Sequence, residues 1–378
     1  MQKVSLVKCT SYEEKEVYEA VKKSIELIGG LNIRNNSKVL IKPNLLRPDA
    51  PDSHVTTHPL AIKAIIRLLK EKNCEIFVGD SPGFHDPLQT AKVSGILDIC
   101  EQENVKFLVF KNKKSCLYKD AILMKRFDLT DIIDQVDYII NVPKLKTHVM
   151  MGVTFAIKNT FGLVVGLDKS QMHLKLQSPE KFASMLVDIN NFVKPHLNVM
   201  DGVIGMEGNG PGNGDIKKVG IISASYDSLA MDIVMCNLVG FDPLIIQTNK
   251  IALSRKEPDF IKNIEIVGEE LNDVKIKFKR GNKKPLSTAL PKGFFNILNQ
   301  LINSRPVINN KKCKVCGECI KICPAKTISM KDYGDKKAAF VNKRNCIRCF
   351  CCHEICPYNA IILKKGSFSA IFEKLRKR

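Results

Sequence analysis

Cysteines near the end of the chain carry the clearest chemistry in this sequence. Residues 313–324 read Cys-Lys-Val-Cys-Gly-Glu-Cys-Ile-Lys-Ile-Cys-Pro, a C-x2-C-x2-C-x3-C-P pattern, and residues 346–357 repeat it thirty-three positions later. In this pattern three cysteines of a tight loop ligate one cuboidal four-iron, four-sulfur (4Fe-4S) cluster, while the fourth is displaced by the next turn and ligates the other cluster. The repeat therefore predicts two 4Fe-4S clusters.

Each predicted cluster takes three ligands from one copy of the motif and one from the other. The first set is Cys313, Cys316, Cys319 and Cys356, and the second is Cys346, Cys349, Cys352 and Cys323. Cys351 is additional to the pattern; we interpret it as a packed or exposed thiol beside the loop, with replacement of Cys352 as a ligand as the alternative. Zinc is the alternative metal, but four-cysteine zinc sites usually use two separated pairs rather than four consecutive ligands ending in Cys-Pro.

Cysteine usage and hydropathy indicate a reducing compartment. Nine of the 14 cysteines fall between Cys313 and Cys356, and the first residues include no apolar stretch of signal-peptide length. No apolar run approaches the roughly 18 residues that a membrane span needs. We therefore expect a cytoplasmic protein without a transmembrane segment. The other five cysteines are predicted to be small core residues: Cys9, Cys74, Cys100, Cys116 and Cys236.

The formal net charge of +20 is unevenly distributed along the chain. Residues 301–378 contain 18 Lys and Arg against 5 Asp and Glu, whereas the rest of the chain contains 41 against 34. The excess lies on the predicted cluster region, where cations offset the negative charge of thiolate-ligated clusters. Because no nucleic-acid motif accompanies it, a redox partner protein with an acidic surface or a small anionic substrate is favoured over nucleic acid.

The residues between the two cysteine motifs have the pattern of a β-hairpin. Apolar stretches at 327–330 and 338–341 flank the turn-like sequence Asp-Tyr-Gly-Asp at 332–335. Together with the cysteine repeat, this region resembles the bacterial-type ferredoxin with two 4Fe-4S clusters. The resemblance implies a small α+β domain that transfers electrons.

The longer region before the cysteines alternates short apolar runs with helical patterns, which predicts an α/β domain with a largely parallel sheet. We expect strands at 38–41, 75–78, 106–110, 138–142, 197–200 and 219–223. We expect helices from a capping box at Ser11 and Glu14 to about Leu27, from Pro59 after Thr57 to about Lys70, and from Pro179 after Ser178 to about Phe192.

Polar residues follow several predicted strands, at the edge where open α/β sheets usually bind their ligands. They are Lys42 and Asn44, Asp80, the segment from Lys144 to His148, and Asp201. Alternate side chains of an extended segment share a face, so Lys144, Lys146 and His148 are expected to converge on one anion or one metal-bound substrate. The alternative is a set of solvated strand ends in a lysine-rich protein.

Two further segments leave alternatives open. Residues 201–215 contain six glycines with Asp201, Glu207 and Asp215 but lack the Walker and dinucleotide patterns, so nucleotide binding is not indicated. We expect either an anion nest with Glu207 as a base or metal ligand, or a flexible surface loop. Lys158 and Asn159 precede Gly162, in a pattern that fits a buried polar site or an exposed turn.

These motifs, in this order, resemble those of a known family. Lys-Pro-Asn at 42–44, Gly-Asp-Ser at 79–81, Pro-Lys-Leu-Lys-Thr-His at 143–148, Ile-Lys-Asn at 157–159 and the stretch from Asp201 to Pro211 are similar to the uncharacterised iron–sulfur centre family known as domain of unknown function 362. The resemblance covers nearly the whole region before the ferredoxin-like domain. It implies one α/β domain fused to a ferredoxin domain, but no particular substrate or reaction.

We divide the chain into four parts. They are an α/β domain at 1–284, a linker helix at 285–304, a ferredoxin domain with two 4Fe-4S clusters at 305–365 and a basic amphipathic tail at 366–378. The linker helix is expected to pack between the two domains. The tail is expected to dock on its own protein, with peripheral contact to an anionic membrane surface as the alternative.

Two functions fit these observations. The first is an iron–sulfur electron-transfer protein of ferredoxin type, an oxidoreductase if it is an enzyme, which relays electrons to an anion-binding site in the α/β domain. Predicted substrate-binding residues are Lys42, Asn44, Asp80, Lys158 and Asn159, and predicted catalytic residues are Lys144, Lys146, His148, Asp201 and Glu207. The second is a non-catalytic ferredoxin-like carrier or scaffold whose α/β domain docks partner proteins.

Overall fold

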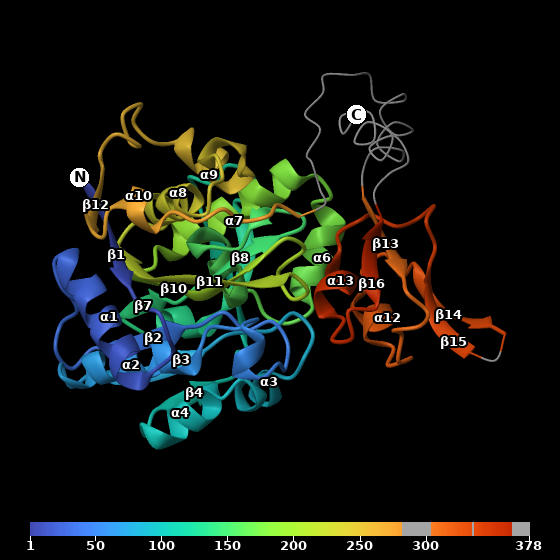
Figure 1. The fold of residues 1–378 in the computed structure, drawn as a ribbon, viewed down its shortest axis with the longest axis horizontal. Helices are drawn as coiled ribbons and strands as arrows, with labels where there is room; N and C mark the ends of the chain where they lie inside the picture. The colour runs from blue at the N-terminus through green and yellow to red at the C-terminus, as the bar shows by residue number, and fades with distance from the viewer. Residues whose placement is uncertain (282–303, 335, 365–378) are drawn as a thin grey trace.

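The computed structural model describes residues 1–281, 304–334 and 336–364. A large α/β domain is followed by a small cysteine-rich domain that packs against its side (Figure 1). The predicted fold class is confirmed: the first domain has a mixed, mostly parallel sheet of ten strands, and the second is a small α+β region with short antiparallel sheets. The predicted linker helix and basic tail lie outside the described residues.

The large sheet is built around neighbouring parallel strands. Its main path runs β12 (Ile264–Gly268), β1 (Gln2–Lys8), β11 (Asp215–Ser225), β10 (Leu197–Glu207), β7 (Tyr138–Asn141), β2 (Lys38–Lys42), β3 (Glu75–Gly79) and β4 (Lys106–Leu108). Strand β8 (Lys144–His148) pairs with β10 and with β9 (Gly152–Val153). Strand β11 is antiparallel to both of its neighbours, whereas β10, β7, β2, β3 and β4 run parallel.

Helices cover both faces of this sheet (Figure 1). One face packs against α1 (Glu14–Leu27) and α2 (Pro59–Lys70), and the other against α7 (Pro179–Val193), α8 (Ser228–Leu238) and α9 (Gln247–Leu253). The remaining elements are α3 (Pro87–Val93), α4 (Ile96–Gln102), α5 (Ala156–Asn159), α6 (Asp168–Lys175), α10 (Leu271–Val274) and the hairpin of β5 (Lys113–Leu117) and β6 (Arg126–Thr130). Side chains alternate along each strand, so Val39 and Ile41 join one core while Leu40 joins the other.

Two local predictions are wrong. Helix α1 begins at Glu14 without a side-chain cap, and the Ser11 hydroxyl donates to the Glu16 carboxylate instead of forming a capping box. The glycine-rich segment 201–215 is not one loop, because most of it belongs to strands β10 and β11, with only 208–214 between them. A Cβ at Gly205 would lie 2.9 Å from the Leu145 carbonyl oxygen, so this glycine permits close packing of β8.

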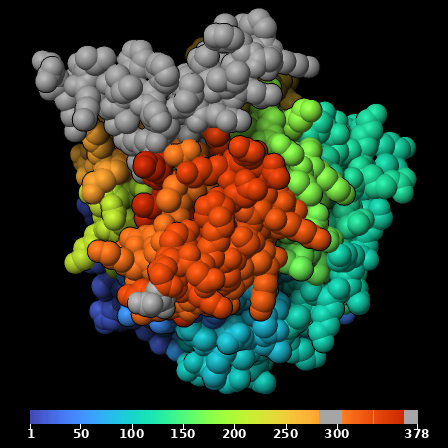
Figure 2. Space-filling model, turned by 90° about the vertical axis from the view of Figure 1, so that its right-hand side faces the viewer, coloured from blue at the N-terminus to red at the C-terminus, as the bar shows by residue number. Residues whose placement is uncertain are grey.

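The cysteine-rich domain places its two helices toward the α/β domain and one hairpin away from it (Figure 1). Its elements are β13 (Arg305–Ile308), α12 (Glu318–Ile322), β14 (Ile328–Tyr333), β15 (Lys336–Val341), α13 (Cys351–Ile355) and β16 (Ile361–Lys364). Strands β14 and β15 form the predicted hairpin. In the space-filling view this domain faces the viewer, and blue to green surface from the first half of the chain is visible beside it (Figure 2). Across the described ranges, none of the helices has the length and apolar character needed to span a bilayer.

Candidate functional site at the domain junction

A cavity lies where the two domains meet, and both domains contribute to its wall. Its volume is about 110 Å³. The α/β domain supplies Asn44, Leu45, Leu46, Asp80, Ser81, Gly83, Thr154, Lys158, Asn159, Phe161, Gly162, Lys169, Ser170 and His173, and the cysteine-rich domain supplies Ile322, Cys351, Glu354 and Ile355. We call this space the junction cavity. Its polar wall lies at the carboxyl ends of parallel strands β2 and β3, where open α/β sheets usually bind ligands.

A buried ion pair supports the floor of the junction cavity. The ammonium group of Lys42, the last residue of β2, lies 3.0 Å from Oδ1 of Asp80, which follows β3. Asp80 Oδ2 also accepts the backbone N–H of Leu45 at 2.8 Å, so the carboxylate fixes the chain after β2. Burial lowers the pKa of Lys42, whereas the charge of Asp80 raises it. Gly162 passes so close that an added Cβ would overlap both charged groups.

A chain of buried amides leads from the sheet to the cavity. Asn198 donates from Nδ2 to the Ser225 carbonyl at 3.2 Å, and its Oδ1 accepts from Asn141 Nδ2 at 2.8 Å. Asn141 Oδ1 accepts from Asn159 Nδ2 at 2.8 Å, and Asn159 Oδ1 accepts from Asn44 Nδ2 at 2.9 Å. The strand register places Asn198 beside Asn141, so this polar line is built into the sheet. Buried amides linked in this way hold one geometry, because a change in any of them leaves its neighbour unpaired.

Helix α5 presents Lys158 and Asn159 to the cavity. Asp232 of α8 accepts the backbone N–H groups of Ala156 and Ile157 at 2.7 and 3.2 Å, which anchors the start of α5. Burial raises the pKa of Asp232 to about 8, although these two hydrogen bonds lower it. Burial also lowers the pKa of Lys158, against the attraction of Glu354 and Cys351. Asn159 is buried and Lys158 is half-buried, so this segment is not an exposed turn.

Two groups in the wall have pKa values near neutrality. Burial lowers the pKa of Lys169 to about 7, while Asp80 raises it and the nearby lysines lower it. The Lys169 ammonium donates to the Ser81 carbonyl at 2.6 Å and to the Val164 carbonyl. Burial raises the pKa of Glu354 to about 7, while Lys158 and Lys146 lower it. The wall of the cavity thus contains a lysine and a carboxyl group whose pKa values burial shifts toward neutrality.

The predicted catalytic residues Lys144 and Asp201 lie in a separate, closed cluster. The Lys144 ammonium donates to Asp201 Oδ2 at 2.9 Å and to the Tyr12 hydroxyl at 2.6 Å, and that hydroxyl donates to Asp201 Oδ1 at 2.7 Å. The His58 N–H also donates to Asp201, and the His58 ring stacks on Tyr12 with centroids 3.6 Å apart. Neither Lys144 nor Asp201 belongs to the wall of the junction cavity.

The other predicted catalytic residues, Lys146, His148 and Glu207, do not meet at one site either. Lys146 is buried and donates to the Val55 carbonyl at 2.5 Å, and burial holds its pKa well below the usual value. His148, at the end of β8, lies 3.2 Å from Glu354 in the cysteine-rich domain. Glu207 accepts the Lys279 N–H at 2.8 Å and lies outside the cavity. Lys144, Lys146 and His148 therefore share a strand face but contact three different partners.

Arg47 joins the two domains, and sequence reasoning did not identify it. Its buried guanidinium donates to the carbonyls of Glu354 at 3.0 Å, Cys356 at 3.1 Å and Gly212 at 2.8 Å. Asp49 accepts from the same group at 2.6 Å. A planar guanidinium with five donors can satisfy several acceptors at once, which a lysine cannot do in the same geometry.

The cysteines of the two motifs lie close enough to affect one another's pKa values, and their division into two sets of four stays a prediction. Burial raises the pKa of Cys319 to about 12, with further contributions from the charges of Cys316, Cys313 and Cys356. Burial likewise raises the pKa of Cys352, with contributions from the charges of Cys349, Cys346, Cys319 and Cys323. Among the described residues, no three His, Cys, Asp or Glu side chains are arranged around a single metal ion. The donor set of eight thiolates fits two 4Fe-4S clusters, and these clusters supply one-electron redox chemistry when bound.

Cys351 stands apart from both groups. It is buried, it lines the junction cavity, and its hydrogen bond to Cys349 lowers the pKa of that thiol. Its position places one residue of the second cysteine motif in the cavity wall. Ile322, Cys351 and Ile355 also pack against Phe84 of the α/β domain, which closes this side of the cavity.

The cavity brings together most of the predicted substrate-binding residues. Asn44, Asp80, Lys158 and Asn159 line it, and Lys42 lies behind Asp80. Sequence reasoning missed Lys169, Arg47 and Glu354. One feature of the sequence could have identified Glu354 as a site residue: it is an acidic residue inside a cysteine motif of a strongly basic region. Lys169 and Arg47 have no distinguishing local pattern, since their roles depend on distant carbonyl groups.

Comparison with known proteins yields two family models. The model described as Domain of unknown function (DUF362) matches residues 39–237, and the model described as 4Fe-4S dicluster domain matches residues 305–357. The thylakoid-associated protein sll1697 of Synechocystis sp. is 32% identical over 248 residues, which are 65% of this chain and 77% of that protein. The lactate racemase apoprotein from Thermoanaerobacterium thermosaccharolyticum aligns with a TM-score of 0.44 and 10% identity, over 63% of this chain and 56% of that chain.

Proposed function

This chain belongs to the family described as Domain of unknown function (DUF362), here joined to a 4Fe-4S dicluster domain, and on that premise we propose that it relays electrons to a small anion bound in the junction cavity. The dicluster domain implies electron transfer and redox partners. Our proposal is that a bound anion accepts the electrons and that the α/β domain binds this anion.

The shared wall of the junction cavity is the observation that supports this proposal best. Cys351 lines the cavity between two predicted ligands of the second cluster, Cys349 and Cys352, while Lys158 and Lys169 line it from the α/β domain. A molecule in the cavity would touch both domains at once. This arrangement supports electron transfer from the dicluster domain to a molecule bound in the cavity.

Different residues of the wall contribute charge, orientation and proton exchange to anion binding. Lys158 and Lys169 supply positive charge in a buried site, where attraction to an anion is stronger than in water. Asn44 and Asn159 orient the anion through the rigid amide chain. Lys169 has a pKa of about 7, which matches an acid or base that exchanges protons near neutral pH. Lys144, Lys146, Asp201 and Glu207 contribute by holding the surrounding strands, and His148 positions Glu354.

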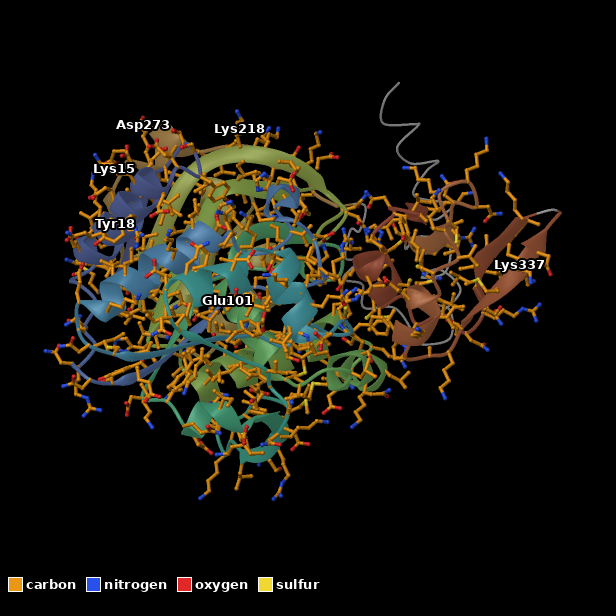
Figure 3. The ribbon with its side chains drawn as sticks, turned by 90° about the horizontal axis from the view of Figure 1, so that it is seen from below. Lys15, Tyr18, Glu101, Lys218, Asp273 and Lys337 are labelled. Carbon is orange, nitrogen blue, oxygen red and sulfur yellow. The ribbon has the colours of Figure 1, made fainter. Side chains whose placement is uncertain are left out.

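Reoxidation of the reduced protein tests the proposal. The full chain with its clusters is reduced by dithionite under anaerobic conditions, freed of reductant, and mixed with oxidised small anions while the visible cluster absorbance is followed. We expect one class of anion to reoxidise the protein, and we expect Lys158→Met to slow this at least tenfold. Lys337→Met is the matched control, since Lys337 lies on the outer hairpin far from the α/β domain (Figure 3). Electron paramagnetic resonance of each variant verifies that its clusters are intact.

A non-catalytic carrier or scaffold is the competing function. The exposed loop of the first cysteine motif favours it, because Cys316 and the neighbouring Lys314 face solvent and offer a surface for a partner protein. A carrier would exchange electrons with protein partners at equal rates in the parent and in Lys158→Met. That result, with no small anion accepting electrons, would refute electron relay to a bound anion and support the carrier function.

A further inference from the structure

The junction cavity contains a buried acceptor without a donor. Asn44 Oδ1 is buried and accepts no hydrogen bond within the described residues. An unpaired buried carbonyl is unfavourable relative to one that accepts a hydrogen bond. Asn44 lines the cavity, so a molecule bound there can supply the missing donor.

The orientation of the Asn44 amide follows from the amide chain rather than from Asn44 alone. The Ser225 carbonyl requires the Nδ2 group of Asn198, so Asn198 must present Oδ1 to Asn141. Each following amide is then fixed in turn, and Asn159 presents Oδ1 to Asn44 Nδ2. A flipped Asn44 would set two oxygens against each other, so its Oδ1 must face away from Asn159.

Glu354 also lies in the wall of the cavity, but its Oε1 lies 3.2 Å from His148 Nε2 and therefore has a partner. The cavity thus offers one unsatisfied oxygen, Asn44 Oδ1, in a wall that also contains Lys158 and Lys169. An anion with acceptors alone would pair with the lysines and leave Asn44 Oδ1 unpaired.

We propose that the junction cavity selects small carboxylates that also carry an O–H or N–H group, and that Asn44 Oδ1 recognises this donor. The inference rests on the proposed function, because it specifies the anion class for the same site. A cavity of about 150 Å³ accommodates benzene, so the 110 Å³ here has room for about four or five non-hydrogen atoms. Hydroxy and amino acids with two carbons meet both requirements.

A pair of ligands that differ by one hydroxyl tests this inference. Calorimetric titration of the full chain with its clusters, in a buffer free of carboxylates, compares glycolate with acetate. One hydrogen bond to an otherwise unpaired buried acceptor should make glycolate bind about tenfold tighter. Asn44→Leu should reduce this ratio to about one. Asn190→Leu is the matched control, because Asn190 is also a buried amide with an unpaired Oδ1 but lies outside the cavity.

The outcomes separate this inference from the proposed function. If neither ligand binds, or if Lys158→Met leaves both affinities unchanged, the anion site itself is refuted. Equal affinities for acetate and glycolate, with both lost in Lys158→Met, would keep the anion site and overturn the donor requirement. A preference for glycolate that persists in Asn44→Leu would assign donor recognition to another group. The comparison in the parent protein does not depend on how well any variant folds.

Discussion

His148 Nε2 lies 3.2 Å from the Glu354 carboxylate, which links the end of strand β8 to helix α13 of the cysteine-rich domain. His148 Nδ1 accepts the N–H groups of Met150 and Met151 at 3.1 and 3.2 Å, so the ring proton belongs on Nε2 and faces Glu354. The two domains thus share a polar contact at the cavity wall, and the geometry of the cavity depends on their docking.

Arg47 should be required for that docking. Arg47→Met removes donors from the buried carbonyls of Glu354, Cys356 and Gly212, which should destabilise the junction by about 3 kcal/mol or more. The measurement is the midpoint of thermal loss of the visible cluster absorbance. Arg34→Met is the control, because the Arg34 side chain is 78% exposed and lies 3.9 Å from its partner Asp137. Equal midpoints for both variants would show that Arg47 does not hold the domains together.

Gly162→Ala should disrupt the support beneath the cavity. The new methyl group would overlap the Lys42 ammonium and the Asp80 carboxylate, and separating a buried pair costs about 3–5 kcal/mol. Chemical denaturation monitored by circular dichroism measures the change. Gly83→Ala serves as the control, since its Cβ would meet only Lys169 at an ordinary 3.8 Å. A variant as stable as the parent would mean that the backbone relaxes without loss.

Much of the fold was predictable because it depends on local pattern. Strands β2, β3 and β7 are short apolar runs followed by polar residues, and helices α2 and α7 begin at prolines. Strand β8 was interpreted as a polar strand exit, yet all five of its residues are buried. Its lysines are tolerated in the interior because Asp201 and the Val55 carbonyl, both distant in sequence, pair with them.

The site was predictable only in part for the same reason. Asn44, Asp80, Lys158 and Asn159 follow strands or occupy a distinctive motif, and the structure places them around one cavity. Lys169 sits in a sequence without any motif, and its place in the wall depends on the carbonyls of Ser81 and Val164. The position of Glu354 depends on how the second domain docks, which no local pattern encodes.

Anion binding should weaken as pH rises through about 7. Lys169 has its pKa lowered to about 7, so it is cationic below that value and neutral above it. Acetate affinity should therefore be constant at lower pH and fall toward tenfold per pH unit above it, if one proton accompanies each anion. Calorimetric titration from pH 5.5 to 8.5 measures this. Lys169→Met should weaken acetate binding at low pH and abolish the fall in affinity above pH 7. If the pH profile of this variant equals that of the parent, the proton belongs to another group, such as Glu354.

Electron uptake should depend on the basic loop around the first cysteine motif. Lys311, Lys312 and Lys314 are exposed beside Cys316, so an acidic one-electron carrier is expected to dock there. Changing the three lysines to glutamate should slow reduction by a flavodoxin at least tenfold at low salt, with the difference shrinking as salt screens the charges. The same reversal at Lys331, Lys336 and Lys337, on the hairpin that points away from the α/β domain, changes the net charge by the same amount and should have a smaller effect (Figure 3). Equal slowing by both sets of substitutions would indicate that total charge, rather than this loop, governs docking.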